Sequence, residues 1–467
     1  MKKVNIIFGL LLCMTSAVMA GCNKNYKPPL VIIPGDGNRE SDKDTSMRYL
    51  ENDRVKLGID LSIGGAVTFL TDVKNGGRNM INSADWGRQI QLSYYSGPIP
   101  YIGPNGEKPY ESWAGLGWNP IQSGDVGGNR SKVIEFEYRD KQTMYVRCIP
   151  MQWPHATGVA GDCEFECIYT LKDNVFTIEA TINNRRSDKT KYGARDQEMP
   201  ALYTNGPWYK LVSYLGDQPF QDQPVTVLVD RNDGKGWPWT GFYTPEQWVA
   251  LLDDAGMGIG VFQPEATVFL GGFHGGDALK GSGEEKDSQT GYIAPITQQI
   301  LDHDIRWTYK TSFILGNIDD IRQYAKENRQ IKARPEWQFR QSRQGWYWQG
   351  EADDAGWQLS GTWDIQFKKT ARLVSPTTFW KAEDVSSLEM EGAFETDSRE
   401  IAIGIEIRLF DNAVCRLTKT VQADGKNRTY RFNLSEITEY KGAVRNIFVI
   451  FPDNDGTAKI KQIRGIN

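Results

Sequence analysis

The sequence has few histidines, no Cys-X-X-Cys motif and no dense cluster of lysine or arginine. Histidine occurs 3 times in 467 residues, and no two histidines have the close spacing of a paired zinc-ligand motif. A metal centre is therefore not predicted, and no cofactor is expected. The 54 Lys and Arg residues are balanced by 59 Asp and Glu residues, for a net charge of −5. Without a basic patch to hold a phosphate backbone, nucleic acid is not predicted as a partner.

After its first segment, the chain also lacks any apolar run long enough to span a bilayer. That first segment has Lys2 and Lys3 ahead of an apolar run over 4–18, and it closes on small residues before Cys22. The pattern resembles a bacterial lipoprotein signal, in which the cysteine is lipidated and becomes the mature N-terminus. The resemblance implies export to the cell envelope, with a lipid anchor as the one membrane attachment. A cleaved signal without lipid is the alternative, and it too places the mature chain outside the cytoplasm.

Four cysteines remain beyond that segment, at positions 148, 163, 167 and 415. Cys163 and Cys167 lie four residues apart on a predicted strand, so they share a face but are too far apart to bridge each other. Cys148 could pair with one of them if the two segments form a hairpin, which export would permit. The disulfide pattern stays open at this point.

Alternation of apolar and polar residues predicts antiparallel strands over most of the chain. A hairpin is predicted from 248–252 and 257–262, which flank a turn. The one predicted helix covers 319–330, with Asp319 as a cap or first-turn acid. The residues that alternate most clearly are Ile134, Phe136 and Tyr138, then Phe176, Ile178, Ala180 and Ile182, and later Ile401, Ile403, Ile405 and Ile407.

These elements predict an all-β chain in which a large antiparallel β-domain is followed by a helix and a smaller β-sandwich. A polar stretch rich in proline and charge separates the signal from the first domain, and a polar connector separates the two domains. The predicted boundaries are 1–21 for the signal, 22–45 for the linker, 46–332 for the large domain, 333–346 for the connector and 347–467 for the β-sandwich.

Short segments at 87–91, 118–122, 197–203 and 269–273 are similar to those of secreted, largely uncharacterised proteins of glycan-degrading Bacteroidetes. The resemblance implies a galactose-mutarotase-like β-supersandwich for the large domain and a galactose-binding-like jelly roll for the smaller one. Such supersandwiches occur in sugar epimerases, polysaccharide lyases and glycoside hydrolases, so the resemblance implies a carbohydrate ligand and leaves the reaction open. The chain departs from the aldose epimerases, because it has no Asn-His pair ahead of a Tyr-Phe and no clear equivalent of their late glutamate.

The densest set of reactive side chains lies in 192–220. We predict Glu198 as a general acid or base and Arg195 as the group that stabilises developing charge. Asp196 and Glu198 are two residues apart and would share a face of a strand, whereas Arg195 and Glu198 meet only if the chain bends. A surface ion-pair cluster is the alternative interpretation. Glu265, ahead of a glycine-rich loop, is a reserve candidate.

Each histidine lies among turn-forming or polar residues. We predict His155 and His274 as proton-transfer groups or as contacts to substrate hydroxyls. His303 lies between two aspartates, which should raise its pKa, and it is predicted as a substrate contact. The alternative for each is a structural histidine that bridges loops.

Aromatic residues are abundant, with 15 tryptophans and 20 tyrosines. Sugar rings stack their apolar face on aromatic side chains and offer hydroxyls to Asn, Gln, Asp and Arg. Most tryptophans in any protein belong to the core, so only part of this set is expected to face a ligand. The predicted substrate-binding residues, besides His303, are Gln91, Trp118, Asn119, Trp153 and Trp208.

Together these features predict a lipid-anchored, carbohydrate-active protein, either a glycoside hydrolase or a polysaccharide lyase, that acts on a poly- or oligosaccharide. The alternative is a non-catalytic glycan-binding lipoprotein that serves polysaccharide uptake. A hydrolase would need two carboxyls at a fixed separation, and a lyase would need a basic cleft with a Tyr or His base. A pure binder would show aromatic platforms with no perturbed carboxyl or histidine beside them.

Overall fold

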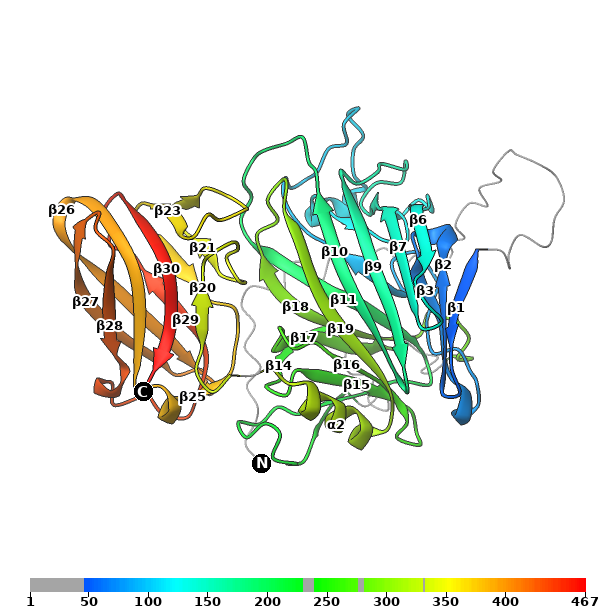
Figure 1. Cartoon of the computed structure of the whole chain (residues 1–467). Coiled ribbons are helices and arrows are strands. Elements are labelled where there is room, and N and C mark those ends of the chain that lie inside the picture. Colours follow the sequence, from blue (N-terminus) through cyan, green and yellow to red (C-terminus); the bar gives the residue numbers. More distant parts are fainter. Residues whose placement is uncertain (1–45, 230–238, 276–280, 331) are drawn as a thin grey trace.

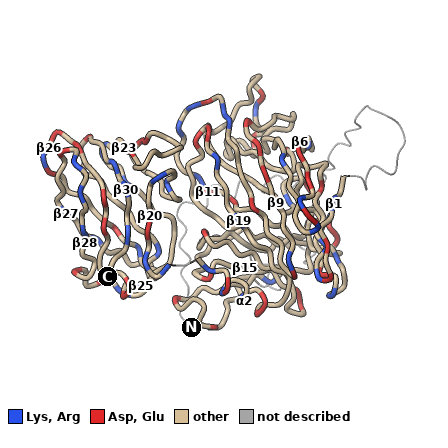
Figure 2. Tube along the Cα trace, in the orientation of Figure 1, with Lys and Arg blue, Asp and Glu red and all other residues tan. Residues whose placement is uncertain are grey.

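The computed structural model describes residues 46–229, 239–275, 281–330 and 332–467. The predicted signal, Cys22 and the predicted linker lie outside the described residues, as does Trp237. Figure 1 shows two β-units side by side, with the helix α2 below the larger one. In the described ranges, no helix combines the length and the apolar character needed to cross a membrane. Lys and Arg are interspersed with Asp and Glu along the strands of both units (Figure 2).

Two antiparallel sheets form the larger unit. We call them sheet 1 and sheet 2. Sheet 1 consists, in spatial order, of β1 (Met47–Glu51), β2 (Val55–Asp60), β3 (Ala66–Asp72), β4 (Ile90–Ser93), β11 (Arg195–Asn205), β18 (Thr290–Gln299), β17 (Val268–His274) and β14 (Thr240–Tyr243), with the short β5 (Pro120–Ile121) and β8 (Met151–Gln152) beside β4. Sheet 2 consists of β13 (Thr226–Val229), β12 (Lys210–Ser213), β15 (Trp248–Leu252), β16 (Gly258–Phe262), β19 (Arg306–Gly316), β10 (Val175–Asn184), β9 (Cys163–Lys172), β7 (Thr143–Ile149) and β6 (Lys132–Tyr138).

The two sheets bury one continuous hydrophobic core between them. Leu57 and Leu202 enter it from sheet 1, and Phe165 enters it from sheet 2. Phe176 and Phe313 stack at 4.6 Å between ring centroids. Each strand that borders this core presents alternate residues to it, as the period of two requires. The opposite face of sheet 1, which we call the outer face, carries a separate cluster that includes Ala201, Tyr292, Ala294 and Ile296.

The predicted strand pattern is confirmed at β10, where the alternating apolar residues are all buried. The predicted hairpin is also confirmed, as β15 and β16. The expected half-buried face of β6 is wrong, because β6 is an edge strand whose register shifts between Val133 and Glu135. Ile134 and Tyr138 are exposed, whereas Phe136 packs partly against the core. Cys148, Cys163, Cys167 and Cys415 are buried free thiols, so the disulfide with Cys148 does not form.

The helix α2 (Ile318–Asn328) begins at Asn317, whose side chain accepts hydrogen bonds from the backbone N–H groups of Asp319 and Asp320. Asp319 is thus a first-turn acid, as predicted. Through Ile321, the helix packs on the face of sheet 2 that points away from sheet 1. A Cβ on Gly260 would come within 2.5 Å of the Ile321 side chain, so glycine lets the helix approach the strand.

The smaller unit is built on a third antiparallel sheet with its own core. The all-β class, with antiparallel sheets and one α-helix in the described part of the chain, agrees with the prediction. The strands of the smaller unit are β21 (Tyr347–Gln349), β24 (Arg372–Val374), β29 (Ala443–Ile450), β26 (Ser387–Leu409), β30 (Gly456–Ile466), β23 (Trp363–Phe367) and β22 (Ala352–Asp354), with β20 (Glu336–Gln338), β25 (Trp380–Lys381), β27 (Val414–Asp424) and β28 (Arg428–Asn433) alongside.

Short 3₁₀ segments occur in both units, at Leu61–Ile63, Val73–Asn75, Glu111–Leu116, Ala382–Asp384 and Leu434–Glu436.

A buried ion-pair cluster joins the two units. Arg343 Nη1 lies 2.6 Å from Asp302 Oδ2 in the larger unit, and Arg343 Nε lies 2.6 Å from Asp354 Oδ2 in the smaller one. The Trp357 backbone N–H donates to Asp302, and the Trp363 indole donates to Asp354. Because both carboxylates have several donors, this buried cluster is well satisfied and fixes the units to each other.

Candidate functional site

The outer face of sheet 1 has a carboxylate at its centre. The pairing of the strands places Ser93 of β4, Glu198 of β11 and Ile296 of β18 in one row across the sheet. The register shifts just after Glu198, so the strand bulges where the row crosses it. The bulge reverses the alternation of faces along β11, so that Leu202 points into the core and Tyr203 lies on the outer face.

Hydroxyl groups surround the Glu198 carboxyl. The Tyr292 hydroxyl donates to Glu198 Oε1, and the hydroxyls of Tyr95 and Ser93 also hydrogen-bond to this carboxyl. Burial raises the pKa of Glu198 above its usual range, and the three hydroxyls oppose that rise only in part. The carboxyl is thus held in place and keeps its proton to a higher pH than an ordinary glutamate does.

Aromatic rings extend from this carboxyl along the outer face. The Tyr203 and Tyr292 ring centroids lie 4.9 Å apart, and Trp239 stacks on Tyr292 at 4.8 Å with an interplanar angle of 18°. Burial also raises the pKa values of Tyr95, Tyr203 and Tyr292, with the Glu198 charge as the next cause. These tyrosines therefore stay protonated and act as hydrogen-bond donors.

Along β11, the residues before Glu198 keep the alternation of faces that their spacing predicts. Asp196 pairs with Gln298, one row from Glu198 on the outer face, and burial raises the pKa of Asp196. The Arg195 guanidinium donates to the backbone carbonyls of Leu116 and Ser96, at 2.5 and 3.2 Å. The Arg195 Cζ atom lies 5.8 Å from the centroid of the Tyr95 ring. Arg195 thus contacts Tyr95, whose hydroxyl hydrogen-bonds to Glu198.

The three histidines lie in different places. His274 ends β17 opposite Thr290, two residues from Tyr292, so it lies on the outer face near the aromatic rings. Burial, and next the charge of Arg88, lowers the pKa of His274. His155 is fully buried, with its ring edge-on to Tyr101 at 5.5 Å, and burial lowers its pKa.

His303 lies on a turn that follows the long strand β18, and its Nδ1 is 3.7 Å from Asp304 Oδ1. Its backbone carbonyl accepts a hydrogen bond from Arg186. The structure thus brings His274 to the face that carries Glu198, whereas His303 belongs to the segment between β18 and β19.

The predicted substrate-binding tryptophans are mostly buried. Trp118 and Asn119 have no exposed surface, and Trp118 packs under the Arg186 guanidinium at 5.1 Å. Their side chains offer no surface to a ligand in this arrangement. Trp153 is 8% exposed and meets Trp113 edge-on at 5.5 Å.

Trp208 is likewise 8% exposed and packs in the core of the larger unit. Gln91 is on the outer face, but its amide donates to the carbonyls of Trp86 and Arg88, at 2.9 and 2.7 Å. The role of Gln91 in this structure is therefore to hold the loop before β4.

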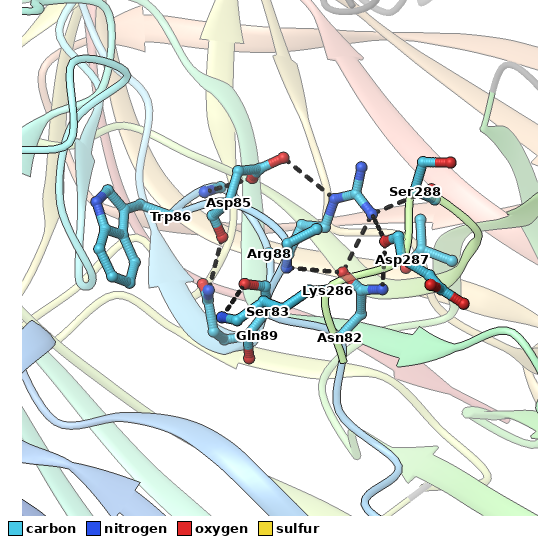
Figure 3. Close-up of polar contacts among 12 residues, drawn as sticks. Asn82, Ser83, Asp85, Trp86, Arg88, Gln89, Lys286, Asp287 and Ser288 are labelled. Carbon is cyan, nitrogen blue, oxygen red and sulfur yellow. Dashed lines mark hydrogen bonds and ion pairs between the residues drawn. The ribbon is translucent and has the colours of Figure 1, made fainter. Parts of the chain in front are cut away.

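Hydrogen bonds drawn in Figure 3 hold that loop, 82–89, against the loop 282–289. Arg88 Nη1 donates to Asn82 Oδ1 at 3.1 Å and to the backbone carbonyls of Asp287 and Ser288. Lys286 Nζ donates to the Ser83 carbonyl at 2.6 Å. Figure 3 shows Trp86 pointing away from this network. The charge of Arg88 acts on both His274 and Tyr203, so the pinned loop borders the outer face.

Sequence reasoning missed Tyr95, Tyr203 and Tyr292, which form the immediate surroundings of Glu198. No local signal marks Tyr203, because strict alternation would place it, five residues from Glu198, on the opposite face of β11, and the bulge brings it to the outer face. In the described residues, no group of three or more His, Cys, Asp and Glu side chains is placed to hold a metal ion.

No protein-family model matches the chain. No curated protein matches it either. Among solved structures, it is similar to a galactose mutarotase related enzyme from Lactobacillus acidophilus, with 13% identity and a TM-score of 0.33 over 58% of this chain and 97% of that one. It is also similar to a putative aldose 1-epimerase from Escherichia coli K12, with 11% identity and a TM-score of 0.36 over 58% and 99%. A GH36 alpha-galactosidase from Geobacillus stearothermophilus matches at 9% identity and a TM-score of 0.36 over 62% and 43%.

Proposed function

We propose that this protein is a carbohydrate-active enzyme whose reaction centre is Glu198. The observation that carries the proposal is the state of that carboxyl: burial raises its pKa, while the hydroxyls of Tyr292, Tyr95 and Ser93 hold it in place. General acid catalysis needs an acid with a pKa near the working pH, fixed where it meets the leaving oxygen. The pKa of Glu198 is raised toward that condition, and its hydroxyl partners fix the carboxyl on the outer face.

Glycoside hydrolysis is the reaction that this arrangement supports best. A lyase would need a tyrosinate or a neutral histidine to remove a proton beside the sugar carboxylate. The raised pKa values of Tyr95, Tyr203 and Tyr292 oppose a tyrosinate. His274, whose pKa is lowered, is a neutral base on this face, and it keeps elimination as a second candidate.

A hydrolase also needs a second carboxyl and a surface for the sugar ring. Asp196 supplies the carboxyl on the same face, about 6.6 Å from Glu198 between Cα atoms for two residues of a strand. Trp239, which is half-buried and stacks on the buried Tyr292 ring at 4.8 Å, supplies the apolar surface. In the proposed reaction Glu198 protonates the glycosidic oxygen as that bond breaks, and Asp196 takes a proton from the water that attacks the ring carbon.

The proposal includes export and a lipid anchor at Cys22, supported by the lysines and the apolar run at the start of the sequence. Non-catalytic glycan binding is the alternative, and one feature favours it. The Glu198 carboxyl is already occupied by three hydroxyls, as a purely structural carboxyl would be. Turnover separates the two functions.

To test the reaction, the soluble chain cut after Cys22 is incubated with plant, algal and host glycans. Released reducing ends and the absorbance of unsaturated uronates are followed together. Reducing ends without that absorbance are expected, and Glu198→Gln should abolish them. Growth of both signals would assign a lyase. If no glycan is turned over but one retards the protein in an affinity gel, the binding function replaces the enzymatic one.

A further inference from the structure

A second candidate site lies away from the outer face of sheet 1. A cavity of about 480 Å³ opens between the larger unit and the connector and smaller unit. Its volume lies in the range of small-molecule sites, about 300–1,000 Å³. Its lining includes Gln247, Glu265, Arg306, Trp307, Arg343 and Trp357. We call it the interunit cavity.

Glu265 projects into this cavity from the segment between β16 and β17. Its side chain is exposed, and within the described residues its carboxylate has no hydrogen-bond or ion-pair partner. Even so, the surrounding walls remove enough water to raise its pKa, with no hydrogen bond to oppose the rise. A carboxylate kept accessible but partly desolvated gains most from a ligand that donates hydrogen bonds to it.

A second acceptor lines the same cavity. Gln247 is 5% exposed, and its Nε2 donates to the Pro264 carbonyl at 2.6 Å. Its Oε1 is buried and has no partner in the described part of the chain. An amide oxygen left without a donor is costly to bury, so a ligand hydroxyl or an ordered water would relieve it. Glu265 is the acceptor exposed in the cavity, and Gln247 adds a second one when its side chain turns its Oε1 toward a ligand.

The arginines of the cavity are already paired. Arg306 donates to Glu166 and to Asn183, and Arg343 is held by Asp302 and Asp354. Neither guanidinium is therefore available to select an anionic ligand. Lys332 also lines the cavity and is exposed. The carboxylates of Glu265 and Glu336, both exposed in the same lining, offset the Lys332 charge, so the cavity favours a neutral ligand rich in hydroxyl donors.

Half-buried tryptophans complete the cavity. Trp307 and Trp357 both line it and pack partly against the core of the larger unit, which fixes their rings. Indole surface beside hydrogen-bond acceptors matches a sugar ring, which has an apolar C–H face and hydroxyl donors at its edge. We propose that the interunit cavity binds a short neutral saccharide, whose hydroxyls donate to Glu265 and Gln247 while its rings pack on Trp307 and Trp357. This site does not depend on the reaction proposed at Glu198.

Calorimetric titration tests the site on the full mature chain. The Glu198→Gln variant is used as the background, so that no probe is consumed. The probes are maltotriose, cellotriose, xylotriose and galactotriose, with glucosamine as a cationic comparison. One neutral trisaccharide should bind, and Glu265→Gln should weaken it by about tenfold or more, because a hydrogen bond to a charged acceptor is lost. Glu439→Gln, which changes an exposed carboxylate of the smaller unit, should leave the affinity unchanged.

Each remaining outcome decides the proposal. Partial recovery of affinity in Glu265→Asp would support a direct contact. The thermal midpoint of Glu265→Gln should match that of its background, because the residue is exposed. Binding that falls with Tyr292→Phe but not with Glu265→Gln would belong to the outer face and overturn the interunit site. So would binding of glucosamine alone, or no binding by any neutral probe. None of these results depends on turnover.

Discussion

The carboxyls of Glu198 and Glu265 both have a pKa raised by burial, but they differ in their hydrogen-bond partners. Glu198 is held within a sheet by hydroxyl donors, with Tyr292 the closest. Glu265 extends into an open cavity without a partner in the described residues.

The difference shows what each carboxyl can do. A carboxyl fixed by the sheet has one orientation, which proton transfer to a defined atom requires. A carboxyl without partners can reorient toward a ligand and gains hydrogen bonds only when the ligand arrives. The raised pKa alone does not distinguish catalysis from binding, whereas the surrounding donors do.

The largest expected effect is on turnover. Glu198→Gln removes the acid while keeping its shape, so the rate on the glycan that the wild type cleaves should fall by about 10²–10⁴-fold. Glu179→Gln, which alters a half-buried carboxylate in the middle of β10, is the matched control and should keep wild-type activity. Initial rates of reducing-end release measure both. A Glu198→Gln enzyme with more than a tenth of the wild-type rate would remove Glu198 from the reaction.

The second-largest expected effect is the loss of stability when the buried ion-pair cluster that joins the two units is broken. Arg343→Met leaves Asp302 and Asp354 buried without their cation, so the free energy of unfolding should fall by about 3–5 kcal/mol. Urea denaturation followed by tryptophan fluorescence measures the loss. Arg340→Met, an exposed neighbour, should change stability by less than about 0.5 kcal/mol. Equal losses in both variants would mean that the buried cluster does not join the units.

A smaller effect is expected when one donor to Glu198 is removed. Tyr292→Phe deletes the hydroxyl that donates to Glu198 Oε1, so about 1–3 kcal/mol of stability should be lost. That hydroxyl lowers the pKa of Glu198, so its removal should raise the pKa further. The high-pH limb of the rate profile, where a general acid loses its proton, should then move to higher pH. A limb that stays in place would show that another group provides the acid.

Local patterns in the sequence predicted the strands, the hairpin and the helix, because each depends on residues close in the chain. They also placed Asp196 and Glu198 on one face of β11, which the register confirms. The partners of Glu198 could not be found in this way, since Tyr292 is 94 residues away and meets it only through the pairing of β11 with β18. Trp118 was predicted to bind substrate, but packing under Arg186 buries it.

The smallest effect is the pH dependence of stability, and it distinguishes the two carboxyls directly. A glutamate whose pKa is raised by folding favours the folded state below its unfolded pKa, about 4.3, and this contribution is lost as pH rises through the folded value. Replacing Glu198 with Gln should therefore flatten the fall in unfolding free energy above about pH 4.3. Glu265→Gln should change it less, because an exposed carboxyl is screened by solvent. Urea unfolding of both variants between pH 4 and pH 8 gives the slope of unfolding free energy against pH for each. A larger change of slope for Glu265→Gln than for Glu198→Gln would show that Glu265, not Glu198, is the more desolvated carboxyl.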